Sequence, residues 1–303
     1  MRDLSVLDVI GHTPLVRLSR LAPSRRLYAK LESLNPGGSV KDRPALQMVL
    51  DAEREGVLPP GGTLIEATSG NTGIGLAVVA AARGYHLLLT MPDNMNTERM
   101  RLLEWLGAEI ILTPAREGMS GAVWRAEEEA KRRGGFLTRQ FENPSNPAAH
   151  RTSTAVEIWD DTGGEVDVLV LGIGTGGTLT GVGETLKAKR PSLRVVGVEP
   201  QRSAVLSGRR PGLTRIHGLG AGFVPGILNR GIIDRVVAVP DEDAIRMARE
   251  VARREGILAG ISSGAALWAA LQVAQEEPPE KVVVTLFPDS GERYLTMLEA
   301  EER

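Results

Sequence analysis

Four short polar or glycine-rich segments hold most of the side chains in this chain that could do chemistry. The first is Gly172–Gly177, in which glycines at 172, 174 and 177 fit the pattern G-x-G-x-x-G directly after the apolar run Val168–Leu171. Such a loop turns a strand into a helix and points backbone N–H groups at an anion, so it predicts a phosphate site. Together with Glu199 at the end of the next expected strand, it also fits a dinucleotide-binding loop. An NAD-dependent dehydrogenase is therefore one interpretation, and a tight turn without a ligand is the plainer one.

The second segment, Thr68–Gly73, lies between an expected strand and an Ala-rich helix and contains Thr68, Ser69, Asn71 and Thr72. Hydroxyl and amide side chains, together with the free N–H groups of a helix start, form a cradle for a small carboxylate. Helix capping would need only one of these side chains. Four of them favour a ligand-binding site.

The third segment, Asn35–Pro44, contains Lys41, one of only six lysines in the chain. Pro44 suits the first turn of a helix, which places Lys41 just ahead of the helix N-terminus. The positive end of the helix dipole disfavours an ammonium group there, and burial would disfavour it further. The position therefore favours a neutral, nucleophilic amine, and the alternative is an exposed lysine paired with Asp42.

The fourth segment, Gly260–Ala266, leads into an apolar helix. Ser263 has the residue type of a helix N-cap. Its neutral hydroxyl could instead face a heteroaromatic nitrogen, and nothing nearby in the sequence decides between the two.

The composition excludes several classes of chemistry. The chain of 303 residues has no Cys, so it has no disulfide, thiolate nucleophile or Cys-ligated metal, and its four His are too far apart in sequence to form a local metal pair. Lys and Arg total 36 against 38 Asp and Glu, and this balance gives no basic field for nucleic acid. Residues 1–8 lack the apolar core of a signal peptide, and no apolar run is long enough for a membrane span. We expect a soluble, cytoplasmic protein without a metal site.

Short β-rich runs alternate with amphipathic or Ala-rich stretches, a pattern typical of βα units and a parallel sheet. We expect strands at Leu64–Ala67, His86–Met91, Glu109–Thr113, Asp167–Ile173, Arg194–Val198, Arg235–Val239 and Val282–Phe287. Helices are expected at Pro44–Gly56, Ile74–Arg83, Thr97–Leu106, Met119–Arg133, Pro147–Asp161, Thr178–Lys189, Asp241–Glu255 and Ser263–Gln275. The length predicts two domains, an N-terminal α/β domain over 1–150 and a C-terminal α/β domain over 151–303.

Taken in order, Asn35–Pro44, Thr68–Gly73, Gly174–Thr178 and Ser262–Ala265 resemble the cysteine synthase (O-acetylserine sulfhydrylase) family over essentially the whole chain. Met91–Met95 and Gln140–Pro147 are similar to the B-type isozyme, whereas Gly218–Phe223 is closer to the A-type. The resemblance implies the fold type II, tryptophan synthase β-like architecture: two open twisted sheets with flanking helices. It also implies a short N-terminal stretch that crosses to the other domain and a mobile subdomain at about 87–133.

The resemblance implies pyridoxal 5′-phosphate as the cofactor and assigns roles to single residues. Lys41 would form the Schiff base with the cofactor and later move the substrate's α-proton. Asn71 would bind the ring 3′-oxygen and Ser263 the pyridine nitrogen. The phosphate would be held by Gly174, Thr175, Gly176, Gly177 and Thr178. The substrate would be held by Thr68, Ser69, Thr72, Gln140 and the backbone at Gly218.

The implied reaction is β-replacement: O-acetyl-L-serine loses acetate to give an aminoacrylate, and sulfide adds to form L-cysteine. Thiosulfate is a second nucleophile that the B-type isozyme accepts. Arg209, Arg210 and Arg215 precede Gly218 and could receive a bulkier anion, although a solvated basic loop is the commoner case. Alternatives within the same chemistry are an O-phosphoserine sulfhydrylase, a cystathionine β-synthase and a serine/threonine dehydratase. The family implies a homodimer, and a complex with serine acetyltransferase has no support in the sequence.

Overall fold

The computed structural model describes residues 3–295, and its contacts divide them into two compact units. Unit 1 contains residues 3–10 and 35–149, and unit 2 contains residues 11–34 and 150–295. Each unit has its own sheet and its own core, and the chain passes between the units three times.

Unit 2 is built on a six-stranded sheet in the order β1-β2-β10-β7-β8-β9. The strands are β1 (Leu15–Arg17), β2 (Arg26–Leu31), β7 (Val166–Gly172), β8 (Arg194–Pro200), β9 (Arg235–Val239) and β10 (Val282–Phe287). All neighbours are parallel except β1, which pairs antiparallel with β2 at the edge. Every residue of β10 is buried, as expected for a Val-rich central strand with both faces covered.

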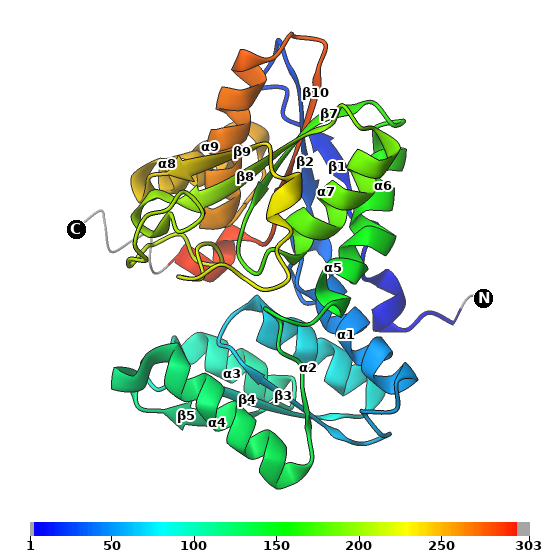
Figure 1. Cartoon of the computed structure of the whole chain (residues 1–303), viewed down its shortest axis with the longest axis vertical. Coiled ribbons are helices and arrows are strands. Elements are labelled where there is room, and N and C mark those ends of the chain that lie inside the picture. Colours follow the sequence, from blue (N-terminus) through cyan, green and yellow to red (C-terminus); the bar gives the residue numbers. More distant parts are fainter. Residues whose placement is uncertain (1–2, 296–303) are drawn as a thin grey trace. The chain divides into compact units, whose positions relative to one another are not determined.

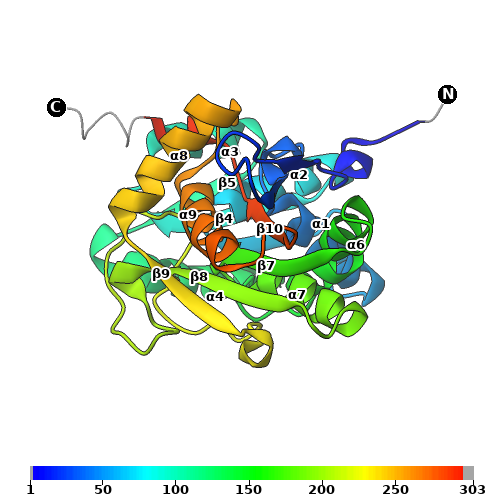
Figure 2. The same cartoon turned by 90° about the horizontal axis from the view of Figure 1, so that it is seen from above.

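The helices of unit 2 are α6 (Ala155–Asp161), α7 (Gly177–Lys189), α8 (Asp241–Glu255) and α9 (Ile261–Glu276). Figure 1 shows α8 and α9 on one face of the sheet and α6 and α7 on the other, and Figure 2 shows the same layers from above. The sheet and helix α9 share one large apolar core that includes Val170, Leu267 and Phe287. Short 3-10 turns lie at Glu32–Leu34, Gln201–Ser203, Arg230–Ile232 and Gly291–Tyr294.

Unit 1 has a four-stranded, fully parallel sheet in the order β5-β4-β3-β6. Its strands are β3 (Thr63–Ala67), β4 (His86–Pro92), β5 (Glu109–Thr113) and β6 (Phe136–Leu137). Alternate residues of β3 enter different cores: Leu64 packs with the helices of one face, and Ile65 packs with Ala122 and Ala126 of the other. This alternation follows the two-residue period of a strand.

The helices of unit 1 are α1 (Asp42–Arg54), α2 (Asn71–Arg83), α3 (Thr97–Trp105), α4 (Gly118–Arg133) and α5 (Ser145–Ala149), with 3-10 turns at Val6–Val9 and Ala115–Glu117. Helix α4 alone covers one face of the sheet, opposite α1, α2 and α3 (Figure 1). Helix α5 runs directly into a π-helical turn at His150–Thr154, which continues into α6.

The structure confirms the seven predicted strands and the α/β class with open sheets and flanking helices, and it adds three strands that the sequence pattern missed. Strand β6 is only two residues long, and β1 only three. Strand β2 contains Arg26 and Lys30, yet the Lys30 side chain is fully buried. Its Nζ lies 2.9 Å from Glu157 and 3.1 Å from Asp161, both on α6, so its charge is paired inside unit 2.

Asp167 of β7 accepts hydrogen bonds from Arg190, Lys281 and Val282 N, and so connects β7 to the end of α7 and to the start of β10. Replacing Asp167 measures how much these contacts stabilise the fold. Burial acts to raise the pKa of its carboxyl, but hydrogen bonds from Val282 N and Lys281 and the charge of Arg190 outweigh burial and hold the pKa below its ordinary value. Because the folded-state pKa is depressed, this stabilisation is present above the unfolded pKa and is lost as the pH falls through the folded pKa. We expect Asp167→Asn to lower the free energy of unfolding by about 1–3 kcal/mol at pH 7. In urea denaturation, the difference from the wild type should shrink as the pH is lowered towards 3, and a constant difference would contradict this account.

Candidate active site

Lys41 lies immediately before α1 and is half-buried. The loop ahead of it folds tightly because the fully buried Asp42 carboxylate turns back and accepts a hydrogen bond from Gly37 N at 2.5 Å. A Cβ at Gly37 would lie 2.5 Å from Asp42 Oδ1, so only glycine fits there. Asp42 therefore holds the backbone of this loop. The Lys41 side chain makes no helix-capping hydrogen bond.

The segment Thr68–Gly73 follows β3, and α2 begins at Asn71 rather than near Ile74 as predicted. Asn71 and Thr72 therefore lie in the first turn of a helix whose N-cap, Gly70, offers no side chain. Thr68 accepts a hydrogen bond from Gly70 N at 3.1 Å, and Ser69 is half-buried. The N-terminus of α2 thus has the uncapped N–H groups that suit an anion.

Within unit 1, the structure brings Thr72 together with Gln140, which lies 68 residues later in the chain. The Thr72 hydroxyl donates to Gln140 Oε1 at 2.6 Å, and both residues are buried. Helix α2 also approaches Lys41 closely, since a Cβ at Gly75 would lie 2.9 Å from the Lys41 carbonyl oxygen. The predicted substrate residues and the predicted nucleophile of unit 1 therefore gather at the start of α1 and α2.

Glu66, the residue before Ala67 at the end of β3, was not identified from the sequence. Its side chain is buried and accepts hydrogen bonds from Thr138 Oγ1 at 2.5 Å, Gln140 N at 3.1 Å and Ala67 N at 3.0 Å. Burial raises the pKa of this carboxyl, and the hydrogen bonds offset only part of the effect. Glu66 thus ties the end of β3 to the backbone of Gln140.

In unit 2, the loop after β7 has the shape of a phosphate cradle. Gly176 is the N-cap of α7 in a left-handed conformation with φ 87°, and it offers no capping side chain. Gly174 lies against the Gly218 loop so closely that a Cβ would stand 2.2 Å from the Gly218 carbonyl oxygen. These glycines place no side chain of their own at the start of α7, where the Thr175 hydroxyl accepts a long hydrogen bond from Gly177 N at 3.4 Å. A glycine-lined helix start with a hydroxyl beside it suits an anion.

Thr178 in the first turn of α7 is held by a residue that sequence reasoning missed. Its hydroxyl lies 3.1 Å from His150 Nε2, and the other ring nitrogen, Nδ1, lies 2.9 Å from Thr154 Oγ1. His150 is 1% exposed and opens the π-helical turn. Single π-helical turns inside α-helices often mark functional positions, and this signal appears only in the structure.

Glu199 does not have the role that a dinucleotide loop would give it. Its buried carboxylate accepts hydrogen bonds from Leu206 N at 2.9 Å, Ser207 N at 3.0 Å and Ser207 Oγ at 2.6 Å. The carboxylate that would hold a ribose therefore fixes the protein's own loop. This arrangement argues against the dehydrogenase interpretation.

Of the two roles left open for Ser263, the structure removes the N-cap role, because α9 begins at Ile261 with Gly260 as its N-cap. Ser263 lies inside the first turn, where it is fully buried, and its Oγ has no hydrogen-bond partner among residues 3–295. A buried polar group without a partner costs free energy and calls for an explanation. A ligand atom that the hydroxyl could meet would provide one.

Replacing Ser263 with Ala separates a ligand-binding hydroxyl from a structural one. Since the Ser263 hydroxyl has no hydrogen-bond partner in the described part of the chain, we expect no loss of thermal stability, but a fall in kcat/KM of about tenfold. Thr285→Val is the matched control, because this buried hydroxyl of unit 2 donates to Val170 O at 2.9 Å. The control should lose about 1 kcal/mol of stability and keep its activity. Melting curves give the stability of both variants, and steady-state rates give their activity. A Ser263→Ala variant that is destabilised but fully active would contradict a ligand-binding role for this hydroxyl.

The remaining predicted residues lie on the loop between β8 and β9. Gly218 is exposed at φ 89°, and its neighbour His217 stacks on Tyr294 at 6.1 Å between ring centroids. Arg209 and Arg210 are exposed, and Arg215 is half-buried.

In the part of the chain that the structure describes, no cluster of three His, Asp or Glu side chains could hold a metal. None of the helices over residues 3–295 is long and apolar enough to cross a membrane.

The comparisons agree with this geometry. Residues 6–289 match the family model of pyridoxal-phosphate dependent enzymes. A cysteine synthase of Staphylococcus aureus (strain Mu50) is 50% identical over 295 residues, which cover 96% of this chain and 95% of the relative.

Two solved structures extend the comparison to the fold. An O-ureido-L-serine synthase has a TM-score of 0.95 at 47% identity, with 98% of this chain and 94% of that chain covered. An O-acetyl serine sulfhydrylase isoform from Entamoeba histolytica has a TM-score of 0.94 at 44% identity, with 98% and 91% covered. The chain therefore belongs to the family of pyridoxal-phosphate-dependent enzymes, and its relatives within that family include cysteine synthases.

Proposed function

We propose that the protein is a cysteine synthase, which converts O-acetyl-L-serine and sulfide into L-cysteine and acetate. The observation that carries this proposal is the buried, unpartnered Ser263 hydroxyl in a pyridoxal-phosphate-dependent enzyme. A neutral hydroxyl facing the pyridine nitrogen does not stabilise its protonated form as a carboxylate would. The cofactor is then a weaker electron sink, which favours prompt loss of a β-substituent over a long-lived carbanion.

The residues present fit the cofactor in both units. In unit 2, the Gly174–Thr178 segment would hold the phosphate at the start of α7, and Ser263 would meet the ring nitrogen. In unit 1, Lys41 would provide the covalent attachment and Asn71 would bind the ring 3′-oxygen. When bound, the cofactor supplies the electron sink that acidifies the substrate's α-carbon and lets the β-substituent leave.

The chain's own residues bind and orient the substrate and move its proton. Thr68, Ser69 and Thr72 at the uncapped start of α2 would bind the α-carboxylate, together with the amide of Gln140. The Gly218 backbone would lie near the amino group. The Lys41 amine, once free, would take the α-proton and return it after sulfide has added. Each role uses a group that unit 1 or unit 2 presents at a loop or a helix start.

We further propose that residues 87–133 close over the bound substrate, as part of an N-terminal domain that ends near residue 150. Closure would shield the reactive intermediate from water. Within this segment, helix α3 has a single buried residue, Leu103, so α3 itself would give up little packing if it moved.

A homodimer is the assembly that we propose. Several large apolar side chains of unit 1 are exposed on the neighbouring elements α3, β5 and α4: Leu102, Trp105, Leu112, Met119, Val123 and Trp124. Trp105 is 92% exposed. Large apolar side chains with this exposure favour burial against another protein surface, which we propose to be a second copy of the chain.

The experiment that tests the function is a substrate panel with the cofactor-loaded enzyme. O-acetylserine, O-phosphoserine and serine are each paired with sulfide, thiosulfate and homocysteine, and the products are measured. The proposal expects the highest kcat/KM for O-acetylserine with sulfide. A preference for O-phosphoserine, or for homocysteine as the nucleophile, would replace it with the corresponding alternative.

A further inference from the structure

We propose that Glu66 is a positioning residue that holds the turn Thr138–Gln140 so that the Gln140 amide can bind the substrate's α-carboxylate. This inference rests on the proposed function, because the role of Gln140 is part of it. Glu66 acts through Gln140 and does not itself touch the substrate.

The turn that presents Gln140 is strained. Arg139 has a left-handed backbone with φ 50°, a conformation that costs free energy for any residue with a side chain. Strain of this kind persists only where surrounding contacts enforce it. The two neighbours of Arg139 in sequence, Thr138 and Gln140, are both buried and both hydrogen-bonded to Glu66.

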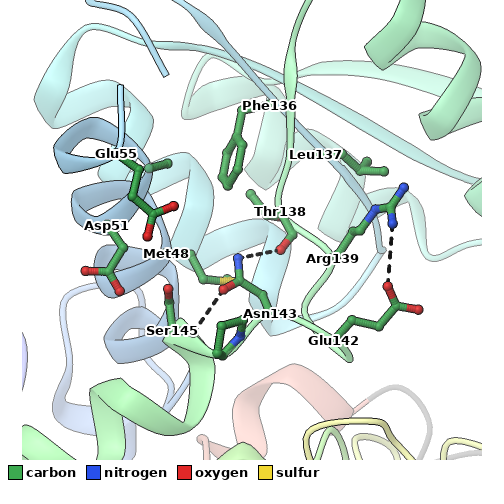
Figure 3. Close-up of a pocket in the computed structure, with 12 residues that line it drawn as sticks. Met48, Asp51, Glu55, Phe136, Leu137, Thr138, Arg139, Glu142, Asn143 and Ser145 are labelled. Atoms are coloured by element: carbon green, nitrogen blue, oxygen red, sulfur yellow. Dashed lines mark hydrogen bonds and ion pairs between the residues drawn. The ribbon is translucent and has the colours of Figure 1, made fainter. Parts of the chain in front are cut away.

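Packing on one side of the turn does not explain how it is held. Thr138 and Arg139 line a cavity of about 330 Å³ together with Met48, Phe136, Leu137 and Asn143 (Figure 3). On this side, the turn is braced by Asn143, whose side chain donates to Thr138 O at 2.9 Å, and by the pairing of Arg139 with Glu142 at 3.6 Å. The Arg139 and Glu142 side chains are largely exposed, so their ion pair contributes little. Backbone hydrogen bonds from Thr138 N to Ile65 O and from Glu142 N and Asn143 N to Arg139 O also hold the turn. None of these bonds engages Gln140 N, which donates to Glu66 on the buried side.

The buried side of the turn presents two backbone N–H groups, and a carboxylate can accept a hydrogen bond from both of them. Oε1 of Glu66 accepts from Ala67 N, and Oε2 accepts from Gln140 N, so each oxygen faces a backbone donor. A glutamine of the same shape would point its NH₂ group at one of these two N–H groups. It would leave a backbone donor of β3 or of Gln140 buried without an acceptor.

The remaining groups of Gln140 are fixed as well. Its carbonyl accepts from Asn146 Nδ2 at 2.8 Å, and its Oε1 accepts from the Thr72 hydroxyl at 2.6 Å. The amide nitrogen is thereby left as the end that can donate to a carboxylate. A shift of Gln140 N would move this donor and the Thr72 hydroxyl together, and small displacements in a binding site are costly.

The test is Glu66→Gln in the cofactor-loaded enzyme. We expect the KM for the amino-acid substrate to rise about tenfold, with kcat and the KM for sulfide changed much less. The cofactor's visible absorbance should be retained, since the Glu66 carboxylate accepts hydrogen bonds from Ala67, Thr138 and Gln140, and none of these residues is proposed to hold the cofactor. Glu129→Gln is the matched control, because Glu129 is equally buried in unit 1 but pairs only with arginines of α4. The control should lose stability without a change in KM.

Two further variants keep the inference testable if Glu66→Gln does not fold. Thr138→Val removes one of the three hydrogen bonds and should raise the same KM by a smaller factor. Arg139→Gly relieves the strain of the left-handed position and, combined with Thr138→Val or Glu66→Gln, should recover part of the lost affinity.

The outcomes distinguish this inference from the proposed function. A wild-type enzyme that gives no β-replacement would overturn the proposed function, whatever Glu66 does. A wild-type enzyme that is active, with unchanged amino-acid KM in Glu66→Gln or Thr138→Val, would overturn the positioning role alone. Equal losses in kcat and in cofactor absorbance would show a merely structural role and would also overturn it.

Discussion

Replacing Lys41 with Ala should reduce turnover at least about 10³-fold, because one amine both attaches the cofactor and transfers the α-proton. The visible absorbance of the attached cofactor should disappear with it. Folding should be little changed, since the half-buried Lys41 precedes α1, where the positive end of the helix dipole disfavours an ammonium group. Steady-state rates, absorbance spectra of the loaded protein and melting curves measure the three quantities.

The matched control is Lys131→Ala, which removes an exposed lysine from the last turn of α4 in the same unit. It should leave the rates and the spectrum unchanged. If Lys41→Ala kept both turnover and absorbance, the attachment would have to be at another lysine, and the site proposed here would be wrong.

Replacing Gly174 with Ala should weaken cofactor binding by about ten- to a hundredfold. This loss of affinity corresponds to the free-energy cost that overpacking typically has, about 1–3 kcal/mol. The added Cβ would lie 2.2 Å from the Gly218 carbonyl oxygen, so either the phosphate loop or the Gly218 loop must move. Backbone cannot give way as the end of a flexible side chain can. Titration of the apoprotein with pyridoxal phosphate gives the affinity.

Gly163→Ala separates this clash from simple backbone strain. Gly163 also lies in unit 2, has a left-handed φ of 59° and has nothing within 4 Å of an added Cβ. Its replacement should lower stability modestly and leave the cofactor affinity intact. Equal affinities for the Gly174→Ala variant and the wild type would contradict the phosphate-loop assignment.

Local sequence predicted the elements well where the signal is local. The apolar run of β10 and the glycines that follow α2, α4 and α8 gave a strand and helix ends close to those observed. Lys30 shows the limit: a lysine is rare in a buried strand, and residues 26–31 were not predicted as one, yet Glu157 and Asp161 of α6 pair with its charge there. That pairing joins positions far apart in the chain, so no local pattern could reveal it.

The sequence by itself determined which residue types stand at the loops that could bind ligands: the lysine before α1, the hydroxyl cluster before α2 and the glycines before α7. The tertiary structure alone decided which polar groups are already used. Glu199 accepts a hydrogen bond from Ser207 N in the loop that follows it, and His150 lies within hydrogen-bond distance of the Thr178 hydroxyl. Glu66 accepts a hydrogen bond from Gln140 N, 74 residues away. The tertiary structure also left the Ser263 hydroxyl without a partner among the described residues. The physical reason is that burying a polar group requires a partner from whatever segment the fold brings near, and local backbone preferences do not specify that segment.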